Sequence, residues 1–385
     1  MAYKILIVDD EPDLELLIRQ KFRQYVRDGR YELTFAQDGK QALEKLGQDS
    51  SIEMVLSDIN MPVMDGLTLL SKLEELNRGL KAVMVSAYGD MKNIRAAMNR
   101  GAFDFVTKPI DFQDLETTIN KTQQTIEAIK TAQHVRQQLL SIQQELGVAA
   151  RIQMSILPAK FPAFPNRKDF DLFAEITPAK EVGGDFYDFF LLDQDHLAIV
   201  IGDVSGKGVP AAIYMAVART LLRATARQGL STGDCLTYVN GALAVQNESS
   251  MFVTLFYGIL NTKTGELEFS SAGHNPPFLF SDAGTRVLEV TNGLVLGVFD
   301  DTRFETQRVH LNRGDGILLY TDGVTEAMNL AEEFFGEKQT ETCLRENGMR
   351  PLQELVQALF SKIREYAGSA RQSDDITVLA VRYLG

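Results

Sequence analysis

The chain has 385 residues, of which 45% are hydrophobic and 24% charged, and its formal net charge is -13. This length suits two domains and a connector better than a single core. The negative charge argues against nucleic acid or an anionic membrane as the main partner. Cys235 and Cys343 lie far apart without a cluster of Cys and His nearby, which argues against a disulfide framework or a zinc site.

The N-terminal apolar stretch is too short for a signal peptide, and no apolar run approaches the roughly 20 residues of a membrane span. A cytoplasmic protein is therefore expected.

Residues 3 to about 111 alternate short apolar strands with amphipathic helices. The expected strands are 3–8, 31–36, 52–57, 81–86 and 103–106, and the expected helices are 12–26, 39–47, 65–76, 91–100 and one beginning near 111. Five such repeats predict a doubly wound parallel sheet of the flavodoxin-like α/β class. In sheets of this kind, functional residues collect at the carboxyl ends of the strands.

Those strand ends carry Asp9, Asp10, Asp58, Ser86 and Lys108. Three carboxylates on one rim repel each other unless a divalent cation lies between them, and oxygen ligands suit Mg²⁺. The lysine contributes a second cation and the serine a hydroxyl donor. The sequence therefore predicts a cation site at this edge of the sheet.

This segment resembles the receiver domain of two-component response regulators. The resemblance rests on Ile-Val-Asp-Asp-Glu at 7–11, Ser-Asp-Ile-Asn-Met-Pro at 57–62 followed by Asp65-Gly66, Ser86-Ala87 and Lys108-Pro109. It implies that Asp58 accepts a phosphoryl group from a sensor histidine kinase. The alternatives are a receiver that is not phosphorylated, or a solvated sheet edge.

The same resemblance implies a role for each residue at the rim. Asp10, Asp58 and the backbone carbonyl of Asn60 would hold Mg²⁺, with Asp9 acting through water. Ser86 and Lys108 would contact the phosphoryl oxygens, as suits the charge of that group. Phe105 takes the position of the family's switch aromatic and lacks the commoner tyrosine hydroxyl.

From Asp111 to Leu157 proline is absent and Gly147 is the one glycine. Apolar or small residues recur here at steps of three and four along an otherwise polar sequence. Such a narrow seam predicts a long helix that forms a coiled coil, and we expect a parallel homodimer. The alternative is a helix folded back onto its own domains. Leu157-Pro158 ends the helix.

After residue 170 strands dominate. The expected strands are 171–177, 186–192, 196–202, 252–261, 266–272, 277–281, 315–321 and 375–383, and the expected helices are 209–228, about 232–247 and 351–367. This mixture predicts an α+β layered β-sandwich.

Aspartates stand at the ends of several of these apolar segments, namely Asp185, Asp203, Asp322, Asp374 and Asp375. Buried carboxylates are costly unless they are neutralised, and two divalent metals would neutralise them and activate a nucleophile. The glycine-rich turn after Asp203 does not have the spacing of a nucleotide-binding P-loop.

This region resembles the metal-dependent serine/threonine phosphatases of the PPM, or protein phosphatase 2C-like, family, in the RsbU and sporulation stage II protein E branch. The motifs that match are Glu145-Leu146 through Arg151-Ile152-Gln153 to Leu157-Pro158, Glu181 to Asp188, Gly202 to Gly208, Ala272 to Pro277, Tyr320 to Ala327 and Asp374 to Thr377.

The resemblance implies that Asp185, Asp203, Asp322 and Asp374 bind two Mn²⁺ or Mg²⁺ ions and are catalytic. Asp203 would bridge the ions, and the Val204 backbone carbonyl would add a further ligand. Two positions depart from the family's pattern. Asp375 stands where relatives often have asparagine, and we expect it to support the ligands. No arginine lies near Asp185, so Lys180 becomes the candidate phosphate contact.

His274, in Ala-Gly-His-Asn-Pro-Pro at 272–277, is expected to be structural.

Together these expectations predict three parts of the chain: a receiver (1–120), a helical linker (111–157) and a phosphatase domain (158–385). Phosphorylation of Asp58 would control dephosphorylation of a phosphoprotein, which the resemblance implies is a STAS-type anti-sigma-factor antagonist. Another phosphoprotein substrate stays open. The competing class is a non-catalytic adaptor that binds a sigma factor or its regulator.

Overall fold

The computed structural model describes residues 2–76, 79–87, 89–245, 247, 250–291 and 293–385. The chain divides into two units, residues 1–141 and 142–385. None of the helices within the described ranges is both long and apolar enough to span a membrane.

The first unit is built on a five-stranded parallel sheet with the order β2-β1-β3-β4-β5. The strands are β1 (Tyr3–Val8), β2 (Tyr31–Ala36), β3 (Met54–Asp58), β4 (Lys81–Ala87) and β5 (Asp104–Lys108). The helices are α1 (Pro12–Lys21), α2 (Arg23–Arg27), α3 (Gly39–Gln48), α4 (Gly66–Glu75), α5 (Met91–Asn99) and the start of α6 (Phe112–Ile156). The predicted doubly wound sheet is confirmed.

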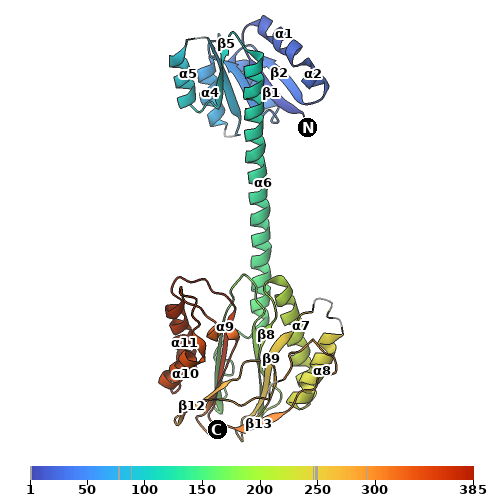
Figure 1. Ribbon diagram of the computed structural model, residues 1–385, viewed down its shortest axis with the longest axis vertical. Coiled ribbons are helices and arrows are strands. Elements are labelled where there is room, and N and C mark those ends of the chain that lie inside the picture. Colours follow the sequence, from blue (N-terminus) through green and yellow to red (C-terminus); the bar gives the residue numbers. More distant parts are fainter. Residues whose placement is uncertain (1, 77–78, 88, 246, 248–249, 292) are drawn as a thin grey trace. The chain divides into compact units, whose positions relative to one another are not determined.

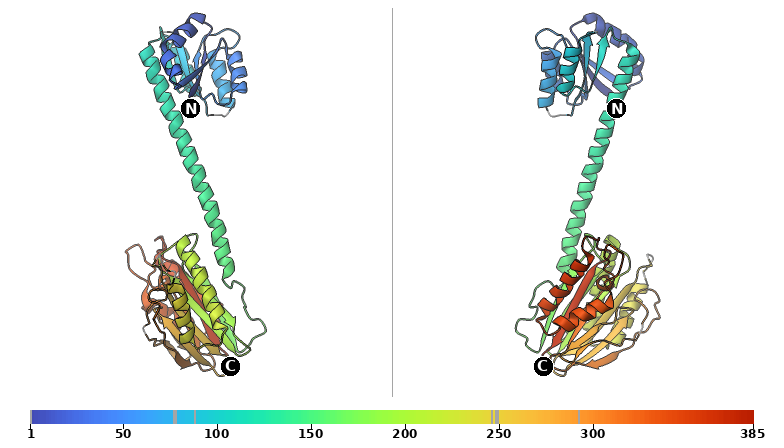
Figure 2. Two further views of the ribbon diagram at one scale, coloured as in Figure 1. Left: turned by 90° about the vertical axis from the view of Figure 1, so that its right-hand side faces the viewer. Right: turned by 60° about the vertical axis from the view of Figure 1, so that its left-hand side comes forward.

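Helices cover both faces of this sheet (Figures 1 and 2). Successive side chains of a strand point to opposite faces, so Leu6 packs with α3 and α4 while Ile7 packs with α1 and α6. Because both faces are buried, β3 is buried along its whole length. This explains why the strands are continuous apolar runs and do not alternate with polar residues.

Helix α6 is one unbroken helix of 45 residues, as predicted. The first positions of its seam, Leu115, Ile119 and Ile126, are buried in the core of the first unit. The seam therefore becomes exposed only beyond Ile126, where Val135 and Ile142 are more than half exposed.

The second unit contains two five-stranded antiparallel sheets, ordered β13-β10-β9-β8-β7 and β12-β11-β14-β15-β6. The strands are β6 (Phe170–Thr177), β7 (Phe186–Leu191), β8 (His196–Val204), β9 (Val253–Asn261), β10 (Glu266–Ala272), β11 (Phe278–Ser281), β12 (Gly284–Val287), β13 (Gln307–His310), β14 (Gly316–Tyr320) and β15 (Ile376–Tyr383). The helices are α7 (Val209–Ala226), α8 (Thr232–Ala244), α9 (Asp322–Thr325), α10 (Gly336–Asn347) and α11 (Leu352–Ala367).

The two sheets share one core, and each carries helices on its outer face. Leu319 and Leu379 point into the core between the sheets, whereas their neighbours Leu318 and Val378 pack with α10 and α11. Helices α7 and α8 lie on the other side, as Figure 1 shows. The predicted α+β organisation, in which strands dominate and a few helices accompany them, is confirmed.

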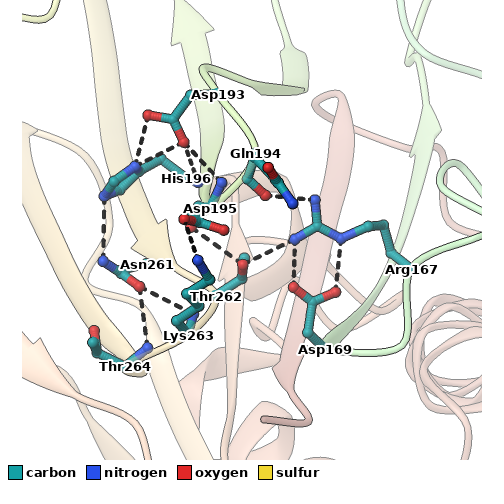
Figure 3. Close-up of polar contacts among 10 residues, drawn as sticks. All are labelled: Arg167, Asp169, Asp193, Gln194, Asp195, His196, Asn261, Thr262, Lys263 and Thr264. Atoms are coloured by element: carbon teal, nitrogen blue, oxygen red, sulfur yellow. Dashed lines mark hydrogen bonds and ion pairs between the residues drawn. The ribbon is translucent and has the colours of Figure 1, made fainter.

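A polar network connects the segment just before β6 with the turns that precede β8 and follow β9 (Figure 3). Arg167 is ion-paired with Asp169 and donates hydrogen bonds to the Gln194 carbonyl (2.8 Å) and the Thr262 hydroxyl (2.9 Å). Lys263 pairs with Asp195 at 2.7 Å. These contacts fasten the segment that follows the linker helix.

Four elements were not predicted from the sequence. Strands β12 and β13 have four residues each and are largely exposed, so they lack a clear alternation. Helix α9 is a single turn, and α10 is polar with a glycine at its first position. The helix expected at about 232–247 ends at Ala244, and residue 246 lies outside the described residues.

Candidate functional site

The carboxyl ends of β1 and β3 bring three aspartates together in the first unit. Oxygen atoms of Asp9, Asp10 and Asp58 lie within 4.8 Å of one another, which is close enough for one cation to bind all three. The Asn60 N–H donates to Asp58 (3.3 Å), so the turn after β3 folds around that carboxylate. The predicted cluster is therefore present at the predicted edge of the sheet.

Lys108, at the end of β5, reaches into this cluster. Its Nζ lies 2.7 Å from Asp58, 2.9 Å from Asp9 and 3.0 Å from Glu11. Burial acts to lower the pKa of Lys108, but its hydrogen bonds to these three carboxylates outweigh burial and raise that pKa. For Asp9, burial raises the pKa in spite of the lysine. The rim thus combines crowded negative charge with one fixed positive charge.

Ser86 and Phe105 lie on the neighbouring strands β4 and β5. Ser86 is fully buried, and its hydroxyl is one of the buried polar atoms with no hydrogen-bond partner in the described chain. A buried hydroxyl without a partner costs free energy, so the Ser86 hydroxyl is suited to donate a hydrogen bond to an oxygen atom of a ligand bound at this edge of the sheet. The Phe105 ring is about one-third exposed on the surface of β5.

In the second unit, Asp185 lies just before β7 and is almost fully buried. Its Oδ2 accepts hydrogen bonds from the hydroxyls of Thr321 (2.7 Å) and Thr377 (2.6 Å). The two threonines stand at the ends of β14 and β15, and the Thr377 N–H also donates to the Thr321 hydroxyl. The Asp185 carboxylate is therefore held in one orientation by the second sheet.

Asp375 holds the turn that precedes Asp185. Its Oδ1 accepts from the Ala179 N–H (2.8 Å), and its Oδ2 accepts from the N–H groups of Gly184 (2.8 Å) and Asp185 (3.4 Å). Because both carboxylate oxygens are occupied by backbone donors, the side chain organises the turn and does not face outward as a free ligand. That Asp375 supports ligands of a metal site stays a prediction.

The turn at the end of β8 packs directly on the Asp185 turn. A Cβ on Gly184 would lie 2.6 Å from the carbonyl oxygen of Val204, so only glycine permits this approach. In the same way a Cβ on Gly323 would lie 1.9 Å from the Asp375 carbonyl oxygen. These two contacts bring the turns that carry the predicted aspartates against each other.

Asp322 begins α9, and Asp374 precedes β15. The Oδ1 of Asp322 is buried and has no hydrogen-bond partner within the described chain. Asp374 is paired with Lys207 (2.7 Å), whose Nζ also donates to the Ser373 carbonyl (2.5 Å). Lys207 thus lies on the rim of the aspartate cluster.

The electrostatics of these aspartates indicate uncompensated negative charge. Burial and the Asp203 carboxylate raise the pKa of Asp185 well above its ordinary value. Burial and the charge of Asp322 raise the pKa of Asp203 to about 7. Burial, Asp374 and Glu326 raise the pKa of Asp322.

This donor set fits divalent cations. All of the groups are hard oxygen donors, and the unpaired Asp322 oxygen requires a partner. Among the described residues, the receiver trio is the one group of three or more potential ligand residues whose oxygen atoms all lie within 4.8 Å of one another.

Lys180 and His274, both singled out from the sequence, stand apart from this cluster. Lys180 is exposed and forms no ion pair with the aspartates in the described part of the chain. His274 is buried, with its Nδ1 2.9 Å from the Thr254 hydroxyl, and burial lowers its pKa to about 4. Burial thus favours the neutral imidazole, and the structural role of His274 stays a prediction.

Four residues around this cluster were not identified from the sequence as parts of a site: Lys207, Thr321, Thr377 and Gln153. Each of the four lies within one of the motifs quoted from the sequence, but a motif alone does not indicate which partner its side chain contacts. The Gln153 side chain donates a hydrogen bond to the Gly183 carbonyl and accepts one from the Gly183 N–H.

Comparison with known proteins assigns both units. Residues 5–120 match the response regulator receiver domain, and residues 193–384 match the family described as stage II sporulation protein E (SpoIIE). Phosphoserine phosphatase RsbU of Bacillus subtilis is 30% identical over 63% of this chain and 70% of its own length.

Protein IcfG of Synechocystis sp. is 31% identical over 62% of this chain, and the match spans 41% of IcfG, less than half of that protein. Among solved structures, the SiaA-PP2C domain of Pseudomonas aeruginosa aligns with a TM-score of 0.57 at 25% identity. This alignment covers 64% of the chain and 98% of that domain.

Proposed function

The chain belongs to the RsbU and SpoIIE family of metal-dependent serine/threonine phosphatases and carries a response regulator receiver domain, and we propose that phosphorylation of Asp58 controls its phosphatase centre. We assign the receiver to residues 1–120, the linker to 111–157 and the phosphatase domain to 158–385. One observation carries the phosphatase assignment most strongly: the carboxylates of Asp185, Asp203 and Asp322, from three separate turns, lie close enough to other carboxylates for their pKa values to be raised.

In the phosphatase domain we assign metal binding to Asp185, Asp203, Asp322 and Asp374, with the Val204 carbonyl as a further ligand. When bound, two Mn²⁺ or Mg²⁺ ions would lower the pKa of a water molecule and stabilise the charge of the phosphoryl group. The protein contributes orientation, because Thr321, Thr377 and Asp375 fix the Asp185 turn before any substrate arrives.

Lys207 supplies the cation that the missing arginine would otherwise provide. Its Nζ is already at the rim of the cluster, 2.7 Å from Asp374. With Asp374 engaged by a metal ion, the ammonium group, which also donates to the Ser373 carbonyl, would be able to contact a substrate phosphoryl oxygen. A lysine binds phosphate as a point charge, so it needs no bidentate geometry.

In the receiver we assign Mg²⁺ binding to Asp10, Asp58 and the Asn60 carbonyl, with Asp9 acting through water. Lys108 and Ser86 would contact the phosphoryl group on Asp58, since the lysine is already 2.7 Å from that carboxylate. A sensor histidine kinase would be the donor of that group.

The substrate we propose is a phosphorylated STAS-type anti-sigma-factor antagonist. This follows from the likeness to RsbU, whose description as a phosphoserine phosphatase supports the bond that is cleaved. The alternative, a non-catalytic adaptor, would bind its protein partner but would not hydrolyse the phosphoserine.

The deciding experiment is Mn²⁺-dependent hydrolysis of phosphorylated STAS-domain proteins, measured with the receiver free and in its beryllofluoride-bound state. Asp322→Asn and Asp374→Asn should abolish turnover while circular dichroism shows a retained fold. Asp301→Asn, at an exposed position away from the cluster, is the matched control. Full activity in either cluster variant would refute the two-metal centre.

The linker is proposed to dimerise in parallel through the exposed part of its seam. Val135, Leu139 and Ile142 are each more than half exposed on α6, which supports a partner helix at these positions. Light scattering on the full chain tests this, and Ile142→Asp should yield monomer, whereas Gln143→Asp at the neighbouring exposed position should not. A wild-type chain that is monomeric at every concentration tested would refute the coiled coil.

A further inference from the structure

Gln153 lies in the last turns of α6, and its side chain is one of the few buried polar groups of that helix. Its Nε2 donates to the carbonyl oxygen of Gly183 (2.6 Å), and its Oε1 accepts from the Gly183 N–H (3.2 Å). The amide therefore pairs with the backbone as a neighbouring strand would. In the described chain, both hydrogen-bonding groups of Gly183 are satisfied by this one side chain.

Gly183 is two residues before Asp185, the most buried of the clustered aspartates. The next residue, Gly184, is held by the Asp375 carboxylate and packs on the Val204 carbonyl. The Asp185 turn is thus held at one end by the linker helix and at the other by the second sheet. A shift of either anchor would move the carboxylate.

The apolar contacts around Gln153 leave the helix end only partly enclosed. A groove of about 570 Å³ separates this end of α6 from α7, and its lining is almost entirely apolar, with Ile152, Ile156, Val182, Ile213 and Val217 among the residues that form it. Apolar contacts are not directional, so they permit several positions of the helix. The two hydrogen bonds of Gln153 are directional and specify one position.

We propose that Gln153 is a positioning residue that makes the geometry of the Asp185 turn depend on the position of α6. This inference rests on the proposed function and adds the point at which the linker acts on the metal centre. Loss of the amide would release Gly183 from α6 and leave the Asp185 turn held only from the second sheet, by Asp375, Thr321 and Thr377. Residues that orient metal ligands typically change metal affinity or activity by about 10- to 100-fold when they are replaced.

The test compares two variants with a matched control in the full chain. Gln153→Leu removes both hydrogen bonds at similar volume, and Gln153→Glu keeps the shape but sets a carboxylate oxygen against the Gly183 carbonyl. Gln144→Leu, at an exposed position on the same helix, is the control. Mn²⁺ affinity is measured by calorimetry, amide hydrogen exchange is followed at Gly183 and Gly184, and turnover is measured with and without beryllofluoride.

We expect both Gln153 variants to bind Mn²⁺ roughly 10- to 100-fold more weakly and to exchange the two glycine amides faster. Their response to beryllofluoride should shrink, and the control should match wild type. Wild-type Mn²⁺ affinity and wild-type exchange in the glutamate variant would overturn the inference. If the leucine variant does not fold, the comparison is made on the glutamate variant.

The experiments distinguish failure of the proposed phosphatase function from failure of the proposed role of Gln153. A wild-type protein that binds Mn²⁺ but hydrolyses no phosphoserine would refute the proposed function, while exchange and Mn²⁺ affinity still report on Gln153.

Discussion

Replacing Thr377 by valine should weaken metal binding without altering the shape of the core. The Thr377 hydroxyl donates to the Asp185 carboxylate at 2.6 Å in a fully buried setting. Hydrogen bonds to charged groups contribute roughly 1.5–3 kcal/mol, and valine has the same branched shape and suits a strand. That free energy corresponds to a roughly 10- to 150-fold increase in the dissociation constant for Mn²⁺.

The measurement is calorimetric titration of the metal-free protein with Mn²⁺, together with the Mn²⁺ dependence of turnover. Thr340→Val is the matched control, because Thr340 is also fully buried but donates to a helix carbonyl in α10, away from the aspartates. We expect the control to lose stability without losing Mn²⁺ affinity. If Thr377→Val binds Mn²⁺ within twofold of wild type, the hydroxyl does not orient the ligand and the argument fails.

Three further outcomes are expected. Lys207→Gln should raise KM for a phosphopeptide roughly 10-fold and weaken inhibition by inorganic phosphate, because it removes a charged contact to the phosphoryl group. Lys180→Gln should change neither quantity. Equal effects of the two substitutions would contradict the assignment of Lys207 as the phosphate contact. The folded-state pKa of His274 (about 4) is below its ordinary value, so the unfolded chain binds this proton more readily and stability should fall as pH drops from about 6.5 toward 4. Imidazole NMR should show His274 neutral near pH 5.5, and titration near 6.5 would disprove this. Asp58→Ala should make turnover equal with and without beryllofluoride, and a persisting difference would place the signal elsewhere.

The parts of the molecule that were predictable are those encoded by local pattern. Asp9, Asp58 and Lys108 each directly follow or end a buried strand, and parallel strands place their carboxyl ends at one edge. The long helix was predictable because nothing interrupts its spacing of apolar residues. The burial of its first turns was not predictable, because apolar residues at this spacing can pack in a coiled coil or in the core of a domain. Leu115 and Ile119 pack in the core of the receiver.

The parts that were missed depend on contacts between distant segments. Thr321 and Thr377 meet at Asp185 only because β14 and β15 are paired, and each alone is an ordinary strand residue. Gln153 reaches Gly183 across 30 positions in sequence, and an amide on a polar helix gives no sign of its partner. Such contacts are set by tertiary packing, which a single sequence does not display.

The close approach of the glycine turns has a consequence for how the chain can change over evolution. Gly184 admits no side chain because the Val204 carbonyl occupies that space, and Gly323 admits none because of the Asp375 backbone. Asp375 in turn holds Gly184. Because a backbone carbonyl is present whichever residue stands at position 204 or 375, no substitution at those positions makes room for a side chain at position 184 or 323. Both glycines should therefore be retained even where the surrounding sequence varies freely.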